Sequence, residues 1–200
     1  MEYYELLAKR RMYRHFSRQP VPDPVLKRIL EAATRGPSAG FTQGFDFLVL
    51  NQRPALDKFW ELAITEDWKE KTTSHQGLWN APVVVLPLAN PDAYLSRYSE
   101  KDKSYANLVT ERDWPIPFWF IDTAFATMLM LNSVVNENLG ALFFGLFRNV
   151  DLIKNAFRIP DTFHPIGAVA IGFPTSDTKS SSAKRPRREQ SSQIHFNTFS

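Results

Sequence analysis

The chain has 200 residues, the length of one domain with a sizeable core, and 44% of them are hydrophobic and 14% aromatic. It has no cysteine, which excludes disulfides, thiolate catalysis and thiolate-held zinc or iron–sulfur sites, so any redox chemistry needs a bound organic cofactor. The net charge is only +3, but basic residues cluster near both ends of the chain, where they suit nucleic acid or one phosphate held from both ends.

The first residues and the lengths of the apolar segments indicate where in the cell the protein is expected. Residues 1–5 are acidic and aromatic, unlike a signal peptide, and no uninterrupted apolar run reaches about 18 residues. We therefore expect a cytoplasmic protein that does not span a membrane.

Helical and strand patterns alternate along the first half of the chain. Residues 2–11 predict a helix. Asp23 is a good N-cap and Pro24 a good first residue for a second helix, which Gly36 is expected to end. A strand, a helix and a strand are predicted next, over residues 45–50, 54–66 and 83–86.

A glycine-rich loop from Gly36 to Gly44 joins the second helix to the first strand. Ser38, Thr42 and Gln43 offer polar groups on a backbone that cannot be a regular helix, and loops of this kind often bind ligands. The loop lacks the patterns of dinucleotide-binding loops and P-loops. A plain helix-to-strand connection is an equal alternative.

The second half of the chain is organised around its longest apolar segment, residues 118–138. Apolar residues cover most of the circumference of the predicted helix, which is typical of a helix inside a core or at the seam of a dimer. Gly140 is expected to end this helix, and Asn149 to cap a short helix. Two further strands are predicted over residues 142–144 and 166–173.

Polar segments surround these elements. Residues 67–80 match no element clearly, and residues 91–113 predict a mobile, partly helical excursion over the surface. Four aromatic residues that follow either pack in a core or dimer contact or shape a substrate slot: Trp114, Phe118, Trp119 and Phe120. We expect one domain over residues 1–174 and an extended basic arm of the same domain over residues 175–200. The order of elements indicates an α+β layered fold.

Basic residues suggest an anion site. Arg10 and Arg14 share one face if the first helix continues, and two adjacent guanidiniums suit a phosphate between them. A solvated basic face is the alternative. Arg185 and Arg187 lie on an arm that could fold back to the same phosphate. The four histidines show no metal-ligand spacing, and no metal site is expected.

The ordered set of motifs resembles the FMN-dependent nitroreductase family, as a divergent member. Nearly the whole chain is covered, by Arg10-Arg11-x-x-Arg14-x-Phe16, Pro20-Val21-Pro22, Pro37-Ser38-Ala39-Gly40-x-x-Gln43, Phe47-Leu48-Val49-Leu50, Ala81-Pro82, Asp122-Thr123-Ala124, Leu139-Gly140, Ile159-Pro160 and Gly172-Phe173-Pro174. The resemblance implies a three-layer α/β/α fold of the α+β class, with a central mixed sheet and a long buried helix. It also implies a homodimer with FMN at an interface that both chains build.

The resemblance assigns residues to the cofactor. Arg10 and Arg14 would hold the flavin phosphate and nearby polar groups, with Arg11 counted in the same motif, and Arg185 and Arg187 would return to the phosphate. The remaining contacts would lie along the ribityl chain and the ring, from Pro37, Ser38, Ala39, Gln43, Phe144 and Gly145.

Two departures from the family pattern lie within these motifs. Met12 stands where serine or threonine is common, and Phe41 stands where asparagine is common. Phe41 would instead place an aromatic wall near the substrate slot. Both changes bear on how the flavin is held.

The resemblance implies an enzyme without a catalytic side chain, because flavin N5 carries the chemistry. We expect it to reduce nitro, quinone or related conjugated electrophiles with NAD(P)H by ping-pong hydride transfer. The alternatives are a non-catalytic protein that binds or sequesters flavin and a basic module that binds nucleic acid, which we do not expect because the net charge is small and no aromatic stacking array is present.

Overall fold

The computed structural model describes residues 1–65, 68, 77–175 and 185–199. Six helices lie in these ranges: α1 (Tyr3–Lys9), α2 (Asp23–Ala33), α3 (Arg53–Ala63), α5 (Pro91–Tyr98), α6 (Phe118–Asn136) and α7 (Val150–Ala156). The strands are β1 (Phe45–Leu50), β2 (Val83–Ala89), β3 (Gly140–Phe144), β4 (His164–Pro165) and β5 (Ala168–Gly172).

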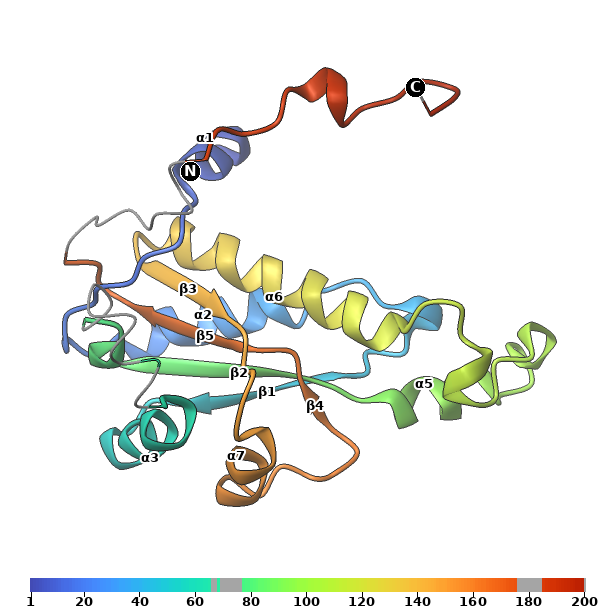
Figure 1. The fold of residues 1–200 in the computed structure, drawn as a ribbon, viewed down its shortest axis with the longest axis horizontal. Coiled ribbons are helices and arrows are strands. Elements are labelled where there is room, and N and C mark those ends of the chain that lie inside the picture. The colour runs from blue at the N-terminus through green and yellow to red at the C-terminus, as the bar shows by residue number, and fades with distance from the viewer. Residues whose placement is uncertain (66–67, 69–76, 176–184, 200) are drawn as a thin grey trace.

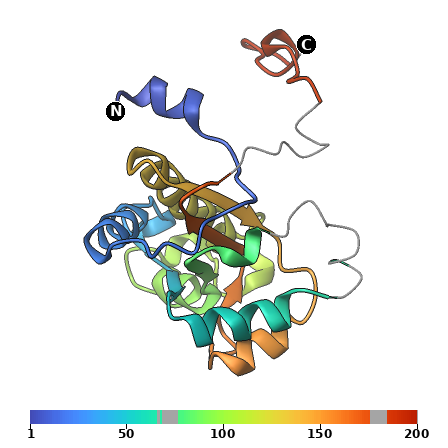
Figure 2. The ribbon, with the colours of Figure 1, turned by 90° about the vertical axis from the view of Figure 1, so that its left-hand side faces the viewer.

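The elements form three layers. Figures 1 and 2 show α2 and α6 on one face of the sheet and α3 and α7 on the other. Side chains alternate along a strand, so β2 supplies both cores. Val83 and Val85 pack with Ile29 and Met130 on the α2–α6 side. Val84 and Leu86 pack on the α3–α7 side with residues such as Phe59.

The strands follow the order β1-β2-β5-β3, and all pairs in this order are antiparallel. Strand β4 also pairs antiparallel with β2. The central sheet is therefore antiparallel, and the mixed sheet that the resemblance implied is wrong; the parallel pairing among the described residues is an isolated bridge between Met12 and Ala141, outside the named strands. The α+β layered prediction is confirmed.

Helix α6 packs into the middle of the fold. Ala126, Met130 and Val134 are fully buried, and the helix contacts α2 and the sheet. By length and composition α6 also passes the test for a membrane span, and in the described part of the chain no other helix does. Its packing identifies it as a core helix. Phe120 and Phe125 nevertheless remain 39% and 50% exposed in the single chain.

The boundary residues of three helices differ from the predictions. Asp23 is the first residue of α2 and Pro22 is the N-cap, so Asp23 does not cap the helix. Asn149 occupies the N-cap position of α7, but its side chain donates to the carbonyl of Leu62 at 2.9 Å and so ties α7 to α3. Gly140 begins β3 because Asn138, with φ of 58°, makes the left-handed turn after α6.

Several predicted segments have different extents. The helix predicted over residues 54–66 ends at Ala63, and the strands predicted over residues 83–86 and 142–144 are longer. The helix predicted over residues 2–11 and the strand predicted over residues 166–173 are shorter, at Tyr3–Lys9 and Ala168–Gly172. Most of residues 67–80 lie outside the described ranges.

Gly36 allows α2 to approach α6 closely. The helix ends at Ala33, and Gly36 follows in the loop, where an added Cβ would lie 2.8 Å from Ala126 Cβ and 2.9 Å from its Cα. Backbone atoms of a packed helix cannot move away cheaply. The glycine therefore serves the contact between the two helices rather than the helix end.

We predict that Gly36→Ala destabilises the protein. Overpacking costs about 1–3 kcal/mol, which exceeds the gain of about 0.4–1 kcal/mol from a less flexible unfolded chain. Urea unfolding followed by circular dichroism measures the difference. Arg35→Ala, an exposed neighbour, should stay within about 0.5 kcal/mol of wild type. Equal stability of Gly36→Ala and wild type would contradict the close contact.

Candidate functional site

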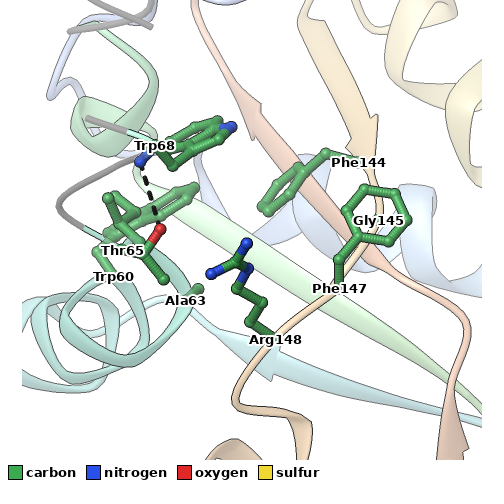
Figure 3. A pocket seen from close by; sticks show the side chains of 9 residues that line it. Trp60, Ala63, Thr65, Trp68, Phe144, Gly145, Phe147 and Arg148 are labelled. Carbon is green, nitrogen blue, oxygen red and sulfur yellow. Dashed lines mark hydrogen bonds between the residues drawn. The ribbon is translucent and has the colours of Figure 1, made fainter. Parts of the chain in front are cut away.

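A cavity of about 230 Å³ opens beside the end of β3. Its walls are mostly aromatic: Trp60 from α3 stacks on Phe144 from β3, with ring centroids 5.6 Å apart and planes 16° apart. The remaining lining residues are Ala63, Ile64, Thr65, Trp68, Gly145, Phe147 and Arg148. Figure 3 shows the Arg148 side chain pointing toward the stacked rings of Trp60 and Phe144.

Two donor-bearing side chains line this cavity, the buried indole of Trp60 and the solvent-exposed guanidinium of Arg148. Trp60 is 5% exposed, and its Nε1–H is buried without a hydrogen-bond partner. Arg148 makes no described hydrogen bond, ion pair or cation–π contact, and no carboxylate is among the lining residues. A buried unpaired donor is costly unless a ligand satisfies it. The cavity therefore suits a flat aromatic ligand with acceptor atoms at its edge.

The turn after β3 brings backbone close to this cavity. The ring of Phe147 covers Gly145 so closely that an added Cβ would lie 2.4 Å from it. Phe144 and Gly145, both predicted as cofactor contacts, are thus cavity-lining residues.

The basic segment, residues 10–14, is extended rather than helical. Helix α1 ends at Lys9, and Arg10 has extended backbone angles, so the shared helical face predicted for Arg10 and Arg14 is wrong. The segment instead bonds to the sheet, where Tyr13 N–H donates to the Ala141 carbonyl at 2.9 Å. Hydrogen bonds to the sheet therefore stabilise this segment more than a continuation of α1 would.

The arginines of this segment differ in their contacts. Arg11 donates to the Tyr13 hydroxyl at 2.8 Å and lies over its ring, whereas Arg14 donates weakly to the Met12 carbonyl at 3.4 Å. Met12 and Tyr13 pack against the same core cluster as Phe144. The basic segment and the cavity thus flank one core.

The glycine-rich loop is held by a buried carboxylate. Asp122 on α6 is 3% exposed, and its Oδ2 accepts from the Ala39 backbone N–H at 2.8 Å and from the Tyr94 hydroxyl at 2.7 Å. Burial, followed by the hydrogen bond to Asp122, raises the pKa of Tyr94 far above its ordinary value, so Tyr94 remains a donor. Ser38 Oγ accepts from the Gln43 backbone N–H at 2.8 Å.

A side chain of α5 also holds the glycine-rich loop in place. Arg97 Nε donates to the Gly40 carbonyl at 3.0 Å, while its two terminal nitrogens each lie 2.7 Å from an Asp102 oxygen. The Arg97 guanidinium holds the pKa of Asp102 at about 2, so this pair stays ionised well below neutral pH.

Three residues of the glycine-rich loop have left-handed backbone angles. Gly40, Phe41 and Gln43 have φ of 62°, 54° and 53°. A bulky residue such as phenylalanine rarely adopts this region, and strain of this kind concentrates at functional sites. Phe41 is also 78% exposed, so its ring is available for contact with a ligand or a second chain.

A single chain does not bring all the predicted contacts together. The loop meets α6 near its first residues at Asp122, whereas the basic segment meets β3 beyond the other end of α6 at Ala141. At 1.5 Å per residue, the helix between Asp122 and Asn136 is roughly 20 Å long. The basic segment and the glycine-rich loop therefore lie near opposite ends of α6 within one chain, as Figure 1 shows.

The remaining predicted residues are exposed. Pro37 lies on the surface of the loop. Arg185 and Arg187 are exposed and make no hydrogen bond or ion pair that the described ranges include. Their return to a phosphate stays a prediction.

Sequence reasoning missed four residues that shape these sites: Trp60, Tyr94, Asp122 and Arg148. Trp60 lies within the helix predicted over residues 54–66, and neither Trp60 nor Arg148 belongs to a motif. Asp122 carried a usable signal, because it is the one charged residue between Phe118 and Asn136. A lone carboxylate in an apolar helix needs buried donors.

Comparisons with known proteins agree with this geometry. The model of the Nitroreductase family matches residues 7–173. A Methanothermobacter thermautotrophicus protein named as an NADH dehydrogenase/NAD(P)H nitroreductase is 25% identical, over 88% of this chain and 80% of its own. An NADPH-dependent oxidoreductase of Staphylococcus aureus is 22% identical, over 98% of this chain and 73% of its own.

Solved structures share the fold. A nitroreductase family protein from Clostridium difficile superposes with a TM-score of 0.74 at 21% identity, over 100% of both chains. One from Streptococcus pneumoniae gives a TM-score of 0.75 at 17% identity, over 97% of this chain and 99% of that chain.

We predict that Asp122→Ala loosens the loop. The Ala39 N–H and the Tyr94 hydroxyl each lose a buried acceptor, at about 1–3 kcal/mol per group. Hydrogen exchange of the Ala39 amide should therefore accelerate at least about tenfold. Thr127→Val is the control, because Thr127 is buried on the same helix and bonds only within it, to the Thr123 carbonyl. Unchanged protection of Ala39 in Asp122→Ala would show that Asp122 does not hold the loop.

Proposed function

Because the chain belongs to the nitroreductase family, and is thus an NAD(P)H-dependent flavin oxidoreductase, we propose that its flavin is FMN. We further propose that it reduces nitro, quinone or related conjugated electrophiles in the cytoplasm. When bound, the flavin accepts a hydride from NAD(P)H and passes two electrons to the electrophile. The chain lacks a dinucleotide-binding fingerprint, so both substrates would use the same flat slot in turn, as a ping-pong scheme requires.

The observation that carries this proposal is the aromatic cavity at Phe144 and Gly145. Its stacked rings suit a planar ring system, and the unpaired indole N–H of Trp60 suits a ring heteroatom or carbonyl. The guanidinium of Arg148 adds a positive charge. These residues fit the ring of a flavin.

The phosphate end of the cofactor would lie at the basic segment. Met12 and Tyr13, which lie between Arg10 and Arg14, pack against the same core as Phe144 of the cavity. Guanidinium groups bind phosphate as bidentate donors. Arg11 already donates to the Tyr13 hydroxyl, so we expect it to contribute less to phosphate binding than Arg10 and Arg14 do. Arg185 and Arg187 of the proposed arm, residues 175–200, would complete the phosphate site.

A second chain would bring the loop to this cofactor. Pro37, Ser38, Ala39 and Gln43 lie at the far end of α6 from their own basic segment, so a two-fold dimer is the arrangement that joins the two groups. Exposed aromatic residues on α6 support an apolar contact between copies. We propose a homodimer in which each flavin touches both chains and Phe41 borders the substrate slot.

We predict that the purified protein is yellow, with one FMN per chain, and that NADH or NADPH bleaches it. Parallel double-reciprocal lines from initial rates with an electrophile would support the ping-pong scheme. A protein that keeps its colour in the presence of both nicotinamides would be a flavin-binding protein without this activity. A colourless protein that FMN cannot reconstitute would contradict both.

We predict that Arg14→Ala weakens FMN affinity at least tenfold, because a hydrogen bond to a charged group contributes about 1.5–3 kcal/mol. Arg112→Ala, at an exposed arginine outside the basic segment, is the control. Fluorescence titration with FMN measures both. Equal affinities of Arg14→Ala and wild type would remove Arg14 from the site.

Subunit mixing tests the shared site with the same variant. Arg14→Ala and the loop-blocking Ser38→Trp are expressed together, so that half of the dimers are mixed. If each site uses Arg14 of one chain and Ser38 of the other, every mixed dimer has one intact site, and about a quarter of the wild-type FMN content returns. No recovery over the single variants would place both residues in a site within one chain.

A further inference from the structure

The peptide that joins Gly40 to Phe41 is held at both of its polar atoms. Its carbonyl oxygen accepts from Arg97 Nε at 3.0 Å, and its N–H donates to the Ser38 carbonyl at 2.9 Å. Because a peptide is planar, its orientation sets ψ of Gly40 and φ of Phe41 together. Turning this peptide over would break both hydrogen bonds, so the two bonds hold Phe41 at its φ of 54°.

Arg97 is fixed in place by acidic residues as well as by the loop. Both of its terminal nitrogens donate to Asp102 at 2.7 Å, and one of them also donates to Glu100 at 3.0 Å. The Arg97 side chain is only 23% exposed. A guanidinium that is already oriented loses little freedom when it donates to one more acceptor. Arg97 is therefore a charged and well-oriented donor to the Gly40 carbonyl.

The next residue of α5 contacts the same glycine. A Cβ at Gly40 would lie 3.0 Å from Tyr98 Cε2, and the φ of 62° at this position is one that glycine adopts easily. Two neighbouring side chains of α5 thus meet Gly40, one through a hydrogen bond and one through its ring. The conformation of the loop depends on α5 at this point.

Phe41 has no packing of its own that explains its conformation. Its side chain is 78% exposed, so no core contact offsets the unfavourable left-handed backbone. The hydrogen bond from a charged donor to the Gly40 carbonyl supplies that stabilisation. Without it, the peptide is free to turn over, and Phe41 returns to the ordinary region of negative φ. Arg97 therefore sets the direction in which the Phe41 ring points.

We propose that Arg97 is a positioning residue that selects substrates by size: it holds the Phe41 ring in one place beside the substrate slot, so that flat electrophiles enter and bulky ones are excluded. This inference rests on the proposed function, in which Phe41 borders that slot. Arg97 acts through Gly40 and Phe41 rather than by contact with the flavin or the electrophile. Loss of Arg97 frees the ring, which admits bulky electrophiles and changes little for flat ones.

The first part of the test follows the loop without any substrate. In Arg97→Met, hydrogen exchange of the Phe41 amide should accelerate about tenfold, because removing the bond from a charged donor lets the peptide turn over. Arg28→Met is the matched control, since Arg28 also donates to one carboxylate through two nitrogens, but that carboxylate, Glu137, lies at the end of α6 away from the loop. The control should exchange like wild type. Equal rates in Arg97→Met and wild type would overturn the positioning role.

The second part measures kcat/KM of the FMN-loaded protein for p-benzoquinone and for a p-benzoquinone with two tert-butyl groups. The ratio of the flat to the bulky quinone should fall about tenfold in Arg97→Met, through a lower KM for the bulky quinone. Phe41→Ala should lower the ratio as well, and adding Arg97→Met to it should cause no further fall, because both changes act through one ring. Arg28→Met should keep the wild-type ratio.

The outcomes separate this inference from the proposed function. A wild-type protein that binds no FMN, or that reduces neither quinone, overturns the proposed function and the selection of substrates with it. Reduction of both quinones with equal ratios in wild type and Arg97→Met overturns the role of Arg97 alone. A ratio that falls further in the double variant than in Phe41→Ala shows that Arg97 does not act through Phe41, and the inference is again wrong.

Discussion

The packing of α6 against the sheet is the constraint on which the site depends. Ala126, Met130 and Val134 fix the helix on β2 and α2, and this contact sets where each end of the helix lies. The glycine-rich loop is tied to one end and the basic segment to the strand that follows the other. Because a straight helix cannot shorten, the two groups remain roughly 20 Å apart within one chain.

The charged residues around α6 and the sheet have two different roles. Asp122 is buried and has two donors, so its charge organises the loop instead of meeting a ligand. Arg14 in the basic segment and Arg148 at the cavity have no acidic partner among the described residues, so they remain available to anions. Paired charges therefore hold the structure, and unpaired cations mark the proposed cofactor site.

The sequence predicted the elements well where one apolar run formed one element. The strand over residues 45–50 was placed with its observed ends, and the long helix was recognised from its apolar circumference. Helix ends were less predictable, because Asn138 rather than Gly140 makes the turn after α6. The site was partly predicted: Phe144 and Gly145 line the cavity, but Trp60 and Arg148 meet there only through tertiary packing, which no local pattern encodes.

We propose that each FMN contacts the aromatic cavity of one chain and the glycine-rich loop of another. A crystal structure of the FMN-bound protein measures this most directly. We expect the flavin ring to lie against Trp60 and Gly145 of one protomer, with Ser38 and Ala39 of its partner in contact with the same FMN. A flavin whose protein contacts all come from one chain, or that lies away from the cavity, would contradict the account.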